Sequence, residues 1–420
     1  MTELTVRSRT GLDDGRPTVR RRRWYLAALT GVVAALAAGL VTVPRLVHRG
    51  PPTVCGADAL QAEAVSGLAN FATWLRANEV SGLVGEVGWP AGPDAARWDA
   101  LADTWYRAAD LVGLPVTAWA AARWPASYPM AVYRASAGST SLNTSGPQAA
   151  MVERHLSTRR YLRGVVLAGG SFGTGAGYSA ARPGRYGYDY SYENWPSYRF
   201  LAERGVKLVR LALAWERLQP VPGGPLSPTE VARLRQALDS ARRTGLAVVL
   251  DLHSFGEFVA GGPAGPRRLA LGSADLPAAA LADFWARTVA AIRAEPAVVG
   301  YGVLNEPLTL AARGPAGARL WEQASQQAVD AIRRAGGSVT VIVSGYGQTS
   351  PTHWGTFHPR AWIHDPAGRV GYEAHAYFDA DGSGHYAAGY DAELQRADHA
   401  GVGRCVRLPE LTAAGLGGPP

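Results

Sequence analysis

The chain has 420 residues, of which 47% are hydrophobic, and a formal net charge of +8. This length is enough for one large α/β domain with extensions, and two cysteines are too few for a disulfide framework or a zinc cluster. Residues 1–23 hold seven Arg and three acidic residues, which accounts for half of the net charge. The charge is therefore no signature of nucleic-acid binding, and no nucleic-acid partner is expected.

The first predicted element is a membrane anchor behind a basic tail. Residues 1–23 end in the cluster Arg20–Arg23, and the following Trp24–Val43 contains no charged residue. About twenty apolar residues are enough to cross a bilayer as a helix, and the basic flank stays in the cytoplasm. We expect a single-pass cell-membrane protein with residues 1–23 cytoplasmic and the rest of the chain outside. The alternative is a cleaved secretory signal, after which the protein would be secreted.

An outer domain is expected over residues 55–420, after a linker at 44–54. Cys55 opens this domain and Cys405 lies near its end. In an oxidising compartment the two cysteines could form a disulfide that joins the ends of the domain. Two free buried thiols are the alternative.

The beginning of the outer domain alternates between helical and strand patterns. Helical periodicity covers 57–78 and 94–112, and short apolar strands are expected at 82–87 and 115–120. The following stretch, 134–160, is rich in Ser, Thr, Gly and Ala without a sustained period. It is predicted to be linker-like or a long surface loop.

The rest of the chain is more regular. Further strands are expected at 164–168, 207–212, 246–252, 298–304, 339–343 and 370–375. Helices are expected at 195–204, 227–244 (with Ser227 as its cap), 276–294, 316–335 and 388–399. Alternating strands and helices predict βα units and a parallel sheet. With the two early strands the total is eight, which closes a (β/α)8 TIM barrel. An open doubly wound sheet is the alternative, but no Gly-rich phosphate-binding fingerprint follows any strand.

Polar and aromatic residues stand at the carboxyl ends of the predicted strands. Asn305 and Glu306 follow the buried strand 298–304, which Pro307 terminates. The other such residues are Glu86, Trp119, Arg210, His253, His375 and Tyr377. A lone buried His or Trp belongs more often to the core. In a barrel, however, these strand ends converge on one mouth, where catalytic groups lie.

This set of residues suits glycoside hydrolysis. The reaction needs two carboxyl groups beside the scissile bond, one protonated and one ionised, and Arg210 and His375 would favour the ionised form of one of them. No cofactor is expected, and no metal, because the His residues lack i, i+4 or comparable ligand spacing. Candidates for stacking on sugar rings are Trp89, Trp119, Trp195, Trp215 and Trp354. Ordinary packing is expected to explain at least two of these.

Residues 162–377 resemble the catalytic domain of glycoside hydrolase family 5, the cellulase-like family of clan A. The matching runs are Arg163–Gly169, Val209–Leu211, Asp251–His253, Asn305–Pro307 and His375–Tyr377. The resemblance implies a (β/α)8 barrel and a retaining mechanism. It also implies that Glu306 is the acid/base on the fourth strand and that Asn305 binds the sugar 2-hydroxyl. Arg210, His253, His375 and Tyr377 would line the substrate site.

The chain order departs from the family pattern. The family's nucleophile lies on the seventh strand and a Trp on the eighth, but only about forty residues follow Tyr377. Gly85–Gly88, which contains Glu86, looks like the nucleophile strand, and Trp119 looks like the residue on the eighth. We therefore expect a circularly permuted barrel, which begins with the family's seventh and eighth strands and continues with its first to sixth. The alternative is the ordinary order in a truncated barrel, with Glu410 as the nucleophile.

The sequence thus predicts a membrane-anchored retaining glycoside hydrolase with a β-linked glucan as its substrate and partner. Glu306 would protonate the leaving oxygen and Glu86 would attack the anomeric carbon. One alternative is an inactive barrel that binds cell-surface polysaccharide. Another is a transglycosylase with the same site.

Overall fold

The computed structural model describes residues 51–158, 160–352 and 354–409. The expected anchor at 24–43, its basic flank and the alternative nucleophile Glu410 lie outside these residues. Among the helices that are described, none combines the length and apolar character that crossing a membrane requires.

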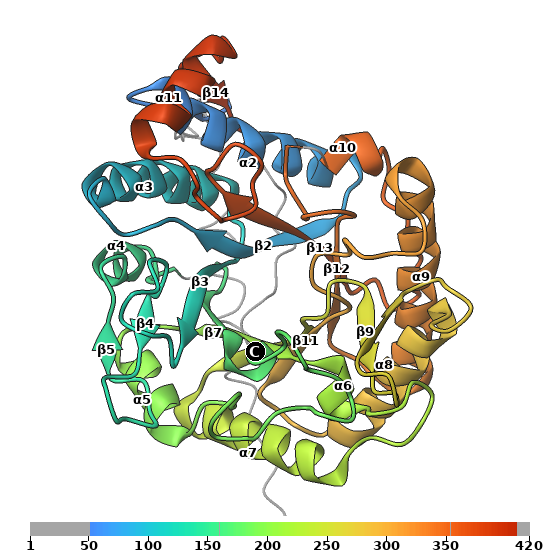
Figure 1. Ribbon diagram of the computed structural model, residues 1–420. Helices are drawn as coiled ribbons and strands as arrows, with labels where there is room; N and C mark the ends of the chain where they lie inside the picture. The colour runs from blue at the N-terminus through green and yellow to red at the C-terminus, as the bar shows by residue number, and fades with distance from the viewer. Residues whose placement is uncertain (1–50, 159, 353, 410–420) are drawn as a thin grey trace, which may run out of the picture. The chain divides into compact units, whose positions relative to one another are not determined.

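Eight parallel strands in the described part of the chain close into a barrel (Figure 1). In their order around the barrel they are β2 (Ser81–Gly88), β13 (Val370–Tyr377), β12 (Thr340–Ser344), β11 (Val298–Gly302), β8 (Ala247–Leu252), β7 (Leu208–Leu213), β6 (Arg163–Leu167) and β3 (Val116–Ala122). The pairing of β3 with β2 closes the ring. These are the eight strands expected from the sequence, and the (β/α)8 barrel is confirmed.

Helices surround the ring of strands (Figure 1). The longer ones are α2 (Ala59–Ala77), α3 (Ala95–Val112), α5 (Trp195–Glu203), α7 (Pro228–Thr244), α8 (Ala278–Ile292), α9 (Gly314–Arg334) and α11 (Tyr390–His399). The cap expected for α7 is confirmed, because the Ser227 hydroxyl accepts a hydrogen bond from the Glu230 amide at 3.3 Å. At its other end α7 stops at Gly245, whose φ of 72° favours glycine.

Among the described residues the buried apolar side chains form one large cluster and two small ones. The large cluster lies between the strands and the surrounding helices. One small cluster, of Ala120, Ala122, Val166 and Ala168, lies along the carboxyl ends of β3 and β6. The other consists of Leu83, Leu208, Val249 and Ile342, which lie in the first half or the middle of four barrel strands. These residues fill the floor of the barrel, so the polar side chains are left to the carboxyl ends of the strands.

The stretch 134–160 was predicted to be linker-like or a long surface loop; its described residues are largely irregular, as in a loop, but they are packed against the barrel and do not form a free linker. It begins at the end of β4 (Tyr133–Arg134), which pairs with β3, and it holds β5 (Thr144–Ser145) and α4 (Ala149–Arg154). Three of its apolar side chains, Leu142, Met151 and Val152, are buried in the core. A two-residue strand and a helix of six residues are too short to leave a period in the sequence.

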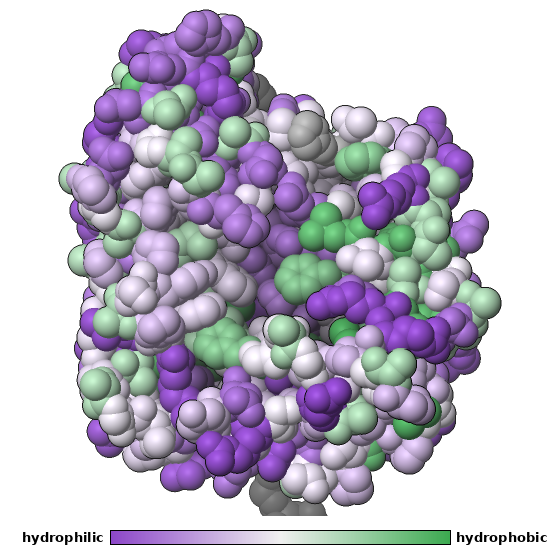
Figure 2. Space-filling view, viewed as in Figure 1, coloured by the Kyte–Doolittle hydropathy of each residue, from purple (hydrophilic) through white to green (hydrophobic). Residues whose placement is uncertain are grey.

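Short elements follow the barrel strands at their carboxyl ends and form the rim of the mouth. They are η1 (Ala168–Ser171), α6 (Trp215–Leu218), the hairpin β9 (Glu257–Ala260) with β10 (Arg267–Ala270), and α10 (Trp354–Phe357). The middle of this face is hollowed, and hydrophilic residues lie in its depth (Figure 2).

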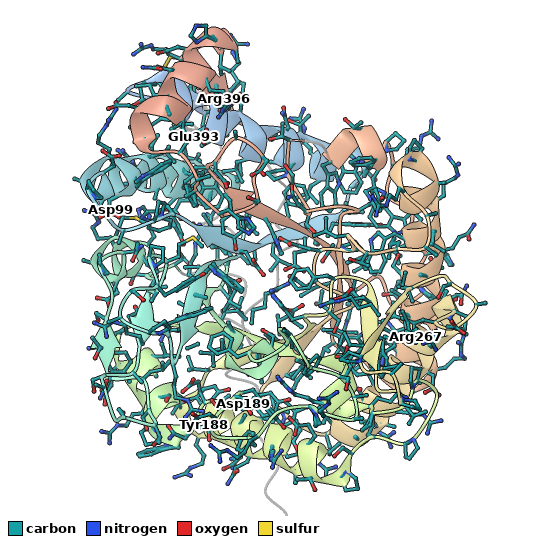
Figure 3. The ribbon with its side chains drawn as sticks, viewed as in Figure 1. Asp99, Tyr188, Asp189, Arg267, Glu393 and Arg396 are labelled. Atoms are coloured by element: carbon teal, nitrogen blue, oxygen red, sulfur yellow. A yellow bond between two sulfur atoms is a disulfide. The ribbon has the colours of Figure 1, made fainter. Side chains whose placement is uncertain are left out.

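The two ends of the domain are joined. β1 (Thr53–Cys55) pairs antiparallel with β14 (Cys405–Arg407), and Cys55 and Cys405 form a disulfide. Thr53 and Val54 therefore belong to the domain and not to the expected linker at 44–54. Beside this pair, Arg396 on α11 contacts Glu63 on α2 at 2.6 Å and Glu393 on its own helix at 2.9 Å (Figure 3).

Candidate active site

An irregularity in β2 turns Glu86 toward the inside of the barrel. Val84 pairs with Ala374 and Glu86 with His375, so Gly85 is an extra residue in β2. In a regular strand Glu86 would face away from the interior residue Leu83, which lies three positions earlier. The bulge reverses this, and Glu86 lies inside the mouth with only 3% of its surface exposed.

Arg210 on β7 lies at the centre of the charged groups. Its Nη1 donates to Glu86 Oε1 at 2.9 Å, and its Nη2 donates to Asn305 Oδ1 at 2.7 Å. Two further carboxylates form ion pairs with it, Asp251 at 2.9 Å and Glu373 at 2.7 Å. All four partners are buried. A single guanidinium therefore contacts three buried carboxylates and stabilises charges that would be costly to bury without a cation beside them.

His375 on β13 connects two carboxylates. Its Nδ1 lies 2.8 Å from Glu306 Oε1, and its Nε2 lies 3.3 Å from Glu373 Oε1. Burial acts to lower the pKa of His375, but the charges of Glu86, Glu306 and Glu373 outweigh it and raise the pKa to about 10. A doubly protonated ring also satisfies both contacts, because each ring nitrogen is then a donor.

Glu306 stands just beyond β11 in a tight backbone conformation. Its φ is 39°, in the left-handed region that costs a non-glycine residue roughly 1–2 kcal/mol. Its side chain is 14% exposed, compared with 3% for Glu86. One carboxylate oxygen of Glu306 and one of Glu86 lie within 4.8 Å of each other. The two groups can therefore act on the same bond.

The carboxylates of the site differ in their affinity for protons. Burial raises the pKa of Glu86, the charge of Glu306 adds to the effect, and His375 and Arg210 oppose it. Tyr377 donates a hydrogen bond to Glu86 at 2.6 Å. Burial also acts to raise the pKa of Glu373, but Arg210 and His375 outweigh it and lower the pKa to about 2. Glu373 is thus fixed in its ionised form, whereas Glu86 accepts a proton more readily.

Trp119 and His253 form one wall of the site. Trp119, in the middle of β3, is half-buried, and its indole N–H donates to the Tyr128 hydroxyl at 2.7 Å. The ring of His253 stacks on Trp119, with ring centroids 5.6 Å apart and planes inclined by 16°. His253 Nδ1 lies 2.8 Å from Asp251 Oδ2, so the wall is tied to the charged groups around Arg210.

Most of the other tryptophan candidates pack elsewhere. Trp89, Trp215 and Trp354 are at most 2% exposed and belong to the core, and Trp195 on α5 lies beneath the guanidinium groups of Arg199 and Arg243. The expectation that packing explains at least two of the five is confirmed. Trp124, which was not predicted, is half-buried, follows β3 by two residues and stacks on Tyr128 with ring centroids 3.8 Å apart.

One polar group of the site is available to a ligand. The Asn305 Nδ2 is buried, and no hydrogen-bond partner for it lies among the described residues. Buried donors are normally satisfied, so this amide is free to donate to a bound group. A cavity of about 100 Å³ that touches His375 and Tyr377 is lined mainly by residues outside the site, among them Leu60 and Glu63 on α2, and does not include Glu86 or Glu306.

Apart from the four tryptophans that pack elsewhere, the structure brings together the residues that the sequence singled out for the site. They are Glu86, Trp119, Arg210, His253, Asn305, Glu306, His375 and Tyr377. The cysteine pair lies apart from them, at the joined ends of the domain. Asp251 and Glu373 were missed as members of the site. The signal for Glu373 was present, because it alternates with His375 and Tyr377 on one face of β13.

Two carboxylates and a histidine can also attract a cation, and the potential ligand atoms of Glu86, Glu306 and His375 lie within 4.8 Å of one another. Both ring nitrogens of His375 already face carboxylates, however. A ring protonated at both nitrogens has no lone pair to give to a metal. The donor set therefore fits a proton better than a metal ion.

Comparison with known proteins identifies similar sequences. Residues 173–404 match the model of the family described as "Cellulase (glycosyl hydrolase family 5)". The chain is 27% identical over 241 residues to "Endoglucanase gh5-1" of Neurospora crassa, which covers 55% of this chain and 54% of that protein. It is also 27% identical over 225 residues to "Endo-beta-1,4-glucanase B" of Emericella nidulans, which covers 53% of this chain and 61% of that protein.

Among solved structures, the chain is similar to Pseudomonas stutzeri endoglucanase Cel5A in complex with cellobiose. The identity is 32%, the TM-score is 0.46, and the alignment covers 54% of this chain and 62% of that one. The chain thus spans only about half to three fifths of the length of the two curated relatives. The matched residues 173–404 include Arg210, Glu306 and His375, and begin after the strands β2, β3 and β6.

Proposed function

The chain belongs to glycosyl hydrolase family 5, and from this membership we propose that it is a retaining glycoside hydrolase that acts on a β-linked glucan. Glu306 protonates the leaving oxygen while Glu86 attacks the anomeric carbon. Water then releases the sugar from Glu86, with Glu306 as the base. The names of the relatives support this substrate class, because they describe an endoglucanase and an endo-β-1,4-glucanase.

The observation that carries the proposal is the distance between the two carboxyl groups. Oxygens of Glu86 and Glu306 lie within 4.8 Å of each other. Retaining glycosidases hold their two carboxyl groups about 5–5.5 Å apart, whereas inverting ones hold them roughly 6.5–9.5 Å apart to leave room for a water. The short distance supports direct attack by Glu86.

The neighbouring residues support the assignment of roles. Arg210 and Tyr377 bind the two oxygens of Glu86 at 2.9 and 2.6 Å, which holds the carboxylate in place for attack, and the charge of Arg210 offsets part of the effect of burial on its pKa. Glu306 is the more exposed of the pair, as suits a group that exchanges protons with water in the second step. The free Asn305 amide is placed to donate to a sugar hydroxyl, and the half-buried Trp119 offers an aromatic surface at the wall.

Substitution of each carboxylate tests the proposal. Glu86→Ala and Glu306→Gln should each lower kcat on a responsive β-glucan by about 10²–10⁴-fold. Glu306→Gln should lose less on aryl β-glycosides, because an activated leaving group needs no proton. Glu203→Gln, on the outer helix α5, is the control and should keep full activity. Full activity in either site variant would refute the assignment.

The products separate the rival functions. Retention predicts that the β-anomer appears first when hydrolysis is followed by proton NMR. Binding without turnover on a panel of glucans and mannans would favour the inactive polysaccharide-binding barrel. Products longer than the substrate would favour the transglycosylase.

The identity of the nucleophile can be tested directly. A 2-deoxy-2-fluoro glycoside with a good leaving group slows release of the covalent sugar, so the modified residue can be found by peptide mass mapping. We expect the label on Glu86. A label on Glu410 would support the ordinary chain order instead.

We also propose that the barrel is circularly permuted relative to its family. The family resemblance puts the acid/base on the fourth strand and the nucleophile on the seventh. Here, β2 with Glu86 comes three strands after β11, which precedes Glu306, in the order β11, β12, β13, β2. A chain reordered to begin in the exposed turn near Gly138, with β14 joined to β1 by a short linker, should fold and keep its activity. A reordered chain that cannot fold would count against this proposal.

The membrane anchor at 24–43 is likewise proposed, with the barrel outside the cell. The uncharged run behind Arg20–Arg23 supports the anchor, and the disulfide between Cys55 and Cys405 supports an oxidising compartment. Full-length protein should stay with membranes after washing in high salt, and deletion of residues 1–43 should release it. Release of the intact barrel with a new amino terminus near residue 44 would favour a cleaved signal.

A further inference from the structure

We propose that Glu373 is a positioning residue of this site, which fixes Arg210 and His375 beside Glu86 and keeps the imidazole of His375 doubly protonated. Glu373 is only 1% exposed and lies behind both partners. It acts through them, because neither of its oxygens is free for a substrate. The kinetic part of this inference rests on the proposed function, whereas the protonation of His375 can be measured without it.

The contacts of Glu373 account for both of its oxygens. Oε1 lies 2.7 Å from Arg210 Nε and 3.3 Å from His375 Nε2, and Oε2 accepts a hydrogen bond from the Ser344 hydroxyl at 3.1 Å. The contact with Arg210 is an ion pair and not a directed hydrogen bond. The carboxylate of Glu373 thus links β13 to Arg210 on β7.

The fold leaves space for Glu373 through the absence of a side chain. A Cβ on Gly85 would lie 1.6 Å from Glu373 Oε1 and 2.5 Å from its carboxyl carbon. No side chain can be accommodated there unless the carboxylate moves. The bulge that turns Glu86 inward therefore also holds Glu373 in place, and the two carboxylates depend on one glycine.

The orientation of His375 shows what Glu373 does. The charged groups that face the ring are Glu306 at Nδ1, Glu373 at Nε2 and Glu86 at 3.7 Å, with Arg210 behind Glu86 and Glu373. A neutral ring has one N–H, so one nitrogen would turn a lone pair toward a carboxylate. With two protons the ring donates to both sides. Removal of Glu373 removes one of the two groups that require the second proton.

Asp251 on β8 is a matched counterpart. It is also fully buried, and its Oδ2 contacts Arg210 Nη1 at 2.9 Å and His253 Nδ1 at 2.8 Å. Each of the two carboxylates therefore contacts Arg210 and one histidine, but the histidines differ. Asp251→Asn removes a similar charge from Arg210 while the contact of His375 with Glu373 is kept.

The sign of the effect on catalysis follows from charge. Loss of one negative charge makes the site more positive, which favours the ionised forms of Glu86 and Glu306. Both limbs of the pH–rate profile should therefore move to lower pH in Glu373→Gln. A residue with a merely structural role would lower the rate at every pH and leave both limbs in place.

The experiment is a titration of His375 in the full-length chain. The chain has nine His residues, so ring-labelled histidine and a His375→Asn variant identify its NMR signal. In the wild type, His375 should stay doubly protonated well above pH 7. Glu373→Gln should lower its midpoint by about one to two pH units. In Glu373→Asp the midpoint of His375 should return most of the way to the wild-type value. In Asp251→Asn the midpoint should change less than it does in Glu373→Gln.

Three results would overturn the proposal. The first is a wild-type His375 that is neutral at pH 7. This measurement does not depend on the folding of any variant. The second is a Glu373→Gln protein whose His375 titrates as in the wild type. The third is an equal shift in Asp251→Asn. If the chain hydrolyses no glycan, the proposed function fails while the NMR titration still decides the role of Glu373. If the chain does hydrolyse a glycan, the basic limb of the pH profile of kcat/KM should move to lower pH by about half a unit to one unit in Glu373→Gln.

Discussion

Two buried clusters in this protein use the same kinds of residue. The mouth cluster consists of Arg210 and His375 with the carboxylates Glu86, Asp251, Glu306 and Glu373. The helix cluster, where α3 and α4 meet the start of β6, consists of Arg163 and His155 with Asp103 and Asp110. In each, a buried arginine pairs with a carboxylate and a histidine lies between two carboxylates.

The clusters differ in how far their carboxylates are exposed. In the mouth cluster Glu86 and Glu373 are 3% and 1% exposed, whereas the side chains of Asp103 and Asp110 are 28% and 33% exposed. Water can hydrate and screen the helix cluster, so its ion pairs contribute little to stability. In the mouth each charge depends on its neighbours. Burial, and not residue type, therefore separates a group that can tune catalysis from one that joins two helices.

The largest expected effect is a difference in unfolding free energy between variants of the two buried arginines, Arg210 in the mouth cluster and Arg163 in the helix cluster. Arg210→Met leaves three buried carboxylates without their cation, which should cost about 3–5 kcal/mol of unfolding free energy at pH 7. Arg163→Met removes an ion pair with the half-exposed Asp110 and should cost about 1 kcal/mol. Urea unfolding of both variants measures the difference.

A second measurement tests the origin of that cost. At lower pH the carboxylates of the mouth cluster bind protons, so the penalty of Arg210→Met should shrink as the pH falls. Arg210→Met should also abolish activity, whereas Arg163→Met should leave it unchanged. Equal costs for the two variants would mean that exposure does not distinguish the clusters.

The next largest effect concerns Gly85. Gly85→Ala should displace Glu373 and cost about 1–3 kcal/mol through overpacking. It should also lower kcat by about tenfold to a hundredfold, because catalytic groups lose rate when misplaced by about 1 Å. Gly371→Ala on β13 is the control, since its Cβ would meet its nearest neighbour at an ordinary 3.8 Å. If both variants behave alike, Gly85 does not hold Glu373 in place.

Much of the barrel and the site could be predicted from the sequence. The apolar runs gave the strands, and Glu306, His375 and Glu86 were recognised because each lies at a strand end. Glu373 was missed because it lies deeper in β13, inside an apolar run, although it alternates with His375 and Tyr377 on one face of that strand. Its partners Arg210 and Gly85 are distant along the chain and meet it only when the barrel closes.

The errors at 134–160 and at 44–54 have a related cause. Short elements such as β1, β5 and α4 are stabilised by partners elsewhere in the chain, and their own residues carry no periodic signal. β1 exists because it pairs with β14, 350 residues away along the chain between the two cysteines. Short elements of this kind need tertiary context, which the sequence patterns do not hold.

The pH dependence of stability should report on His375 and Glu373 in the mouth cluster. Since the pKa of His375 is raised from 6.5 to about 10, its proton stabilises the fold fully below pH 6.5, and this contribution is lost as the pH rises toward 10. For Glu373 the pKa is lowered from 4.5 to about 2, so its contribution is present above pH 4.5 and is lost toward pH 2.

Unfolding free energy should therefore fall between pH 7 and 9, by at most about 1.4 kcal/mol per pH unit for one proton. The slope should flatten in His375→Gln. Urea unfolding at several pH values gives each slope. An unchanged slope in His375→Gln would show that another group is responsible.

The smallest expected effect belongs to the helix cluster. Asp103 lies 3.1 Å from both His155 and Arg107, with 28% of its side chain exposed. Asp103→Asn should cost at most about 1 kcal/mol, and less in high salt, because solvent and ions screen these pairs. Activity and its pH profile should not change, since no group of the mouth cluster contacts α3 in this region. A shifted pH profile would show that the two clusters are coupled through β6, and burial alone would then not explain their difference.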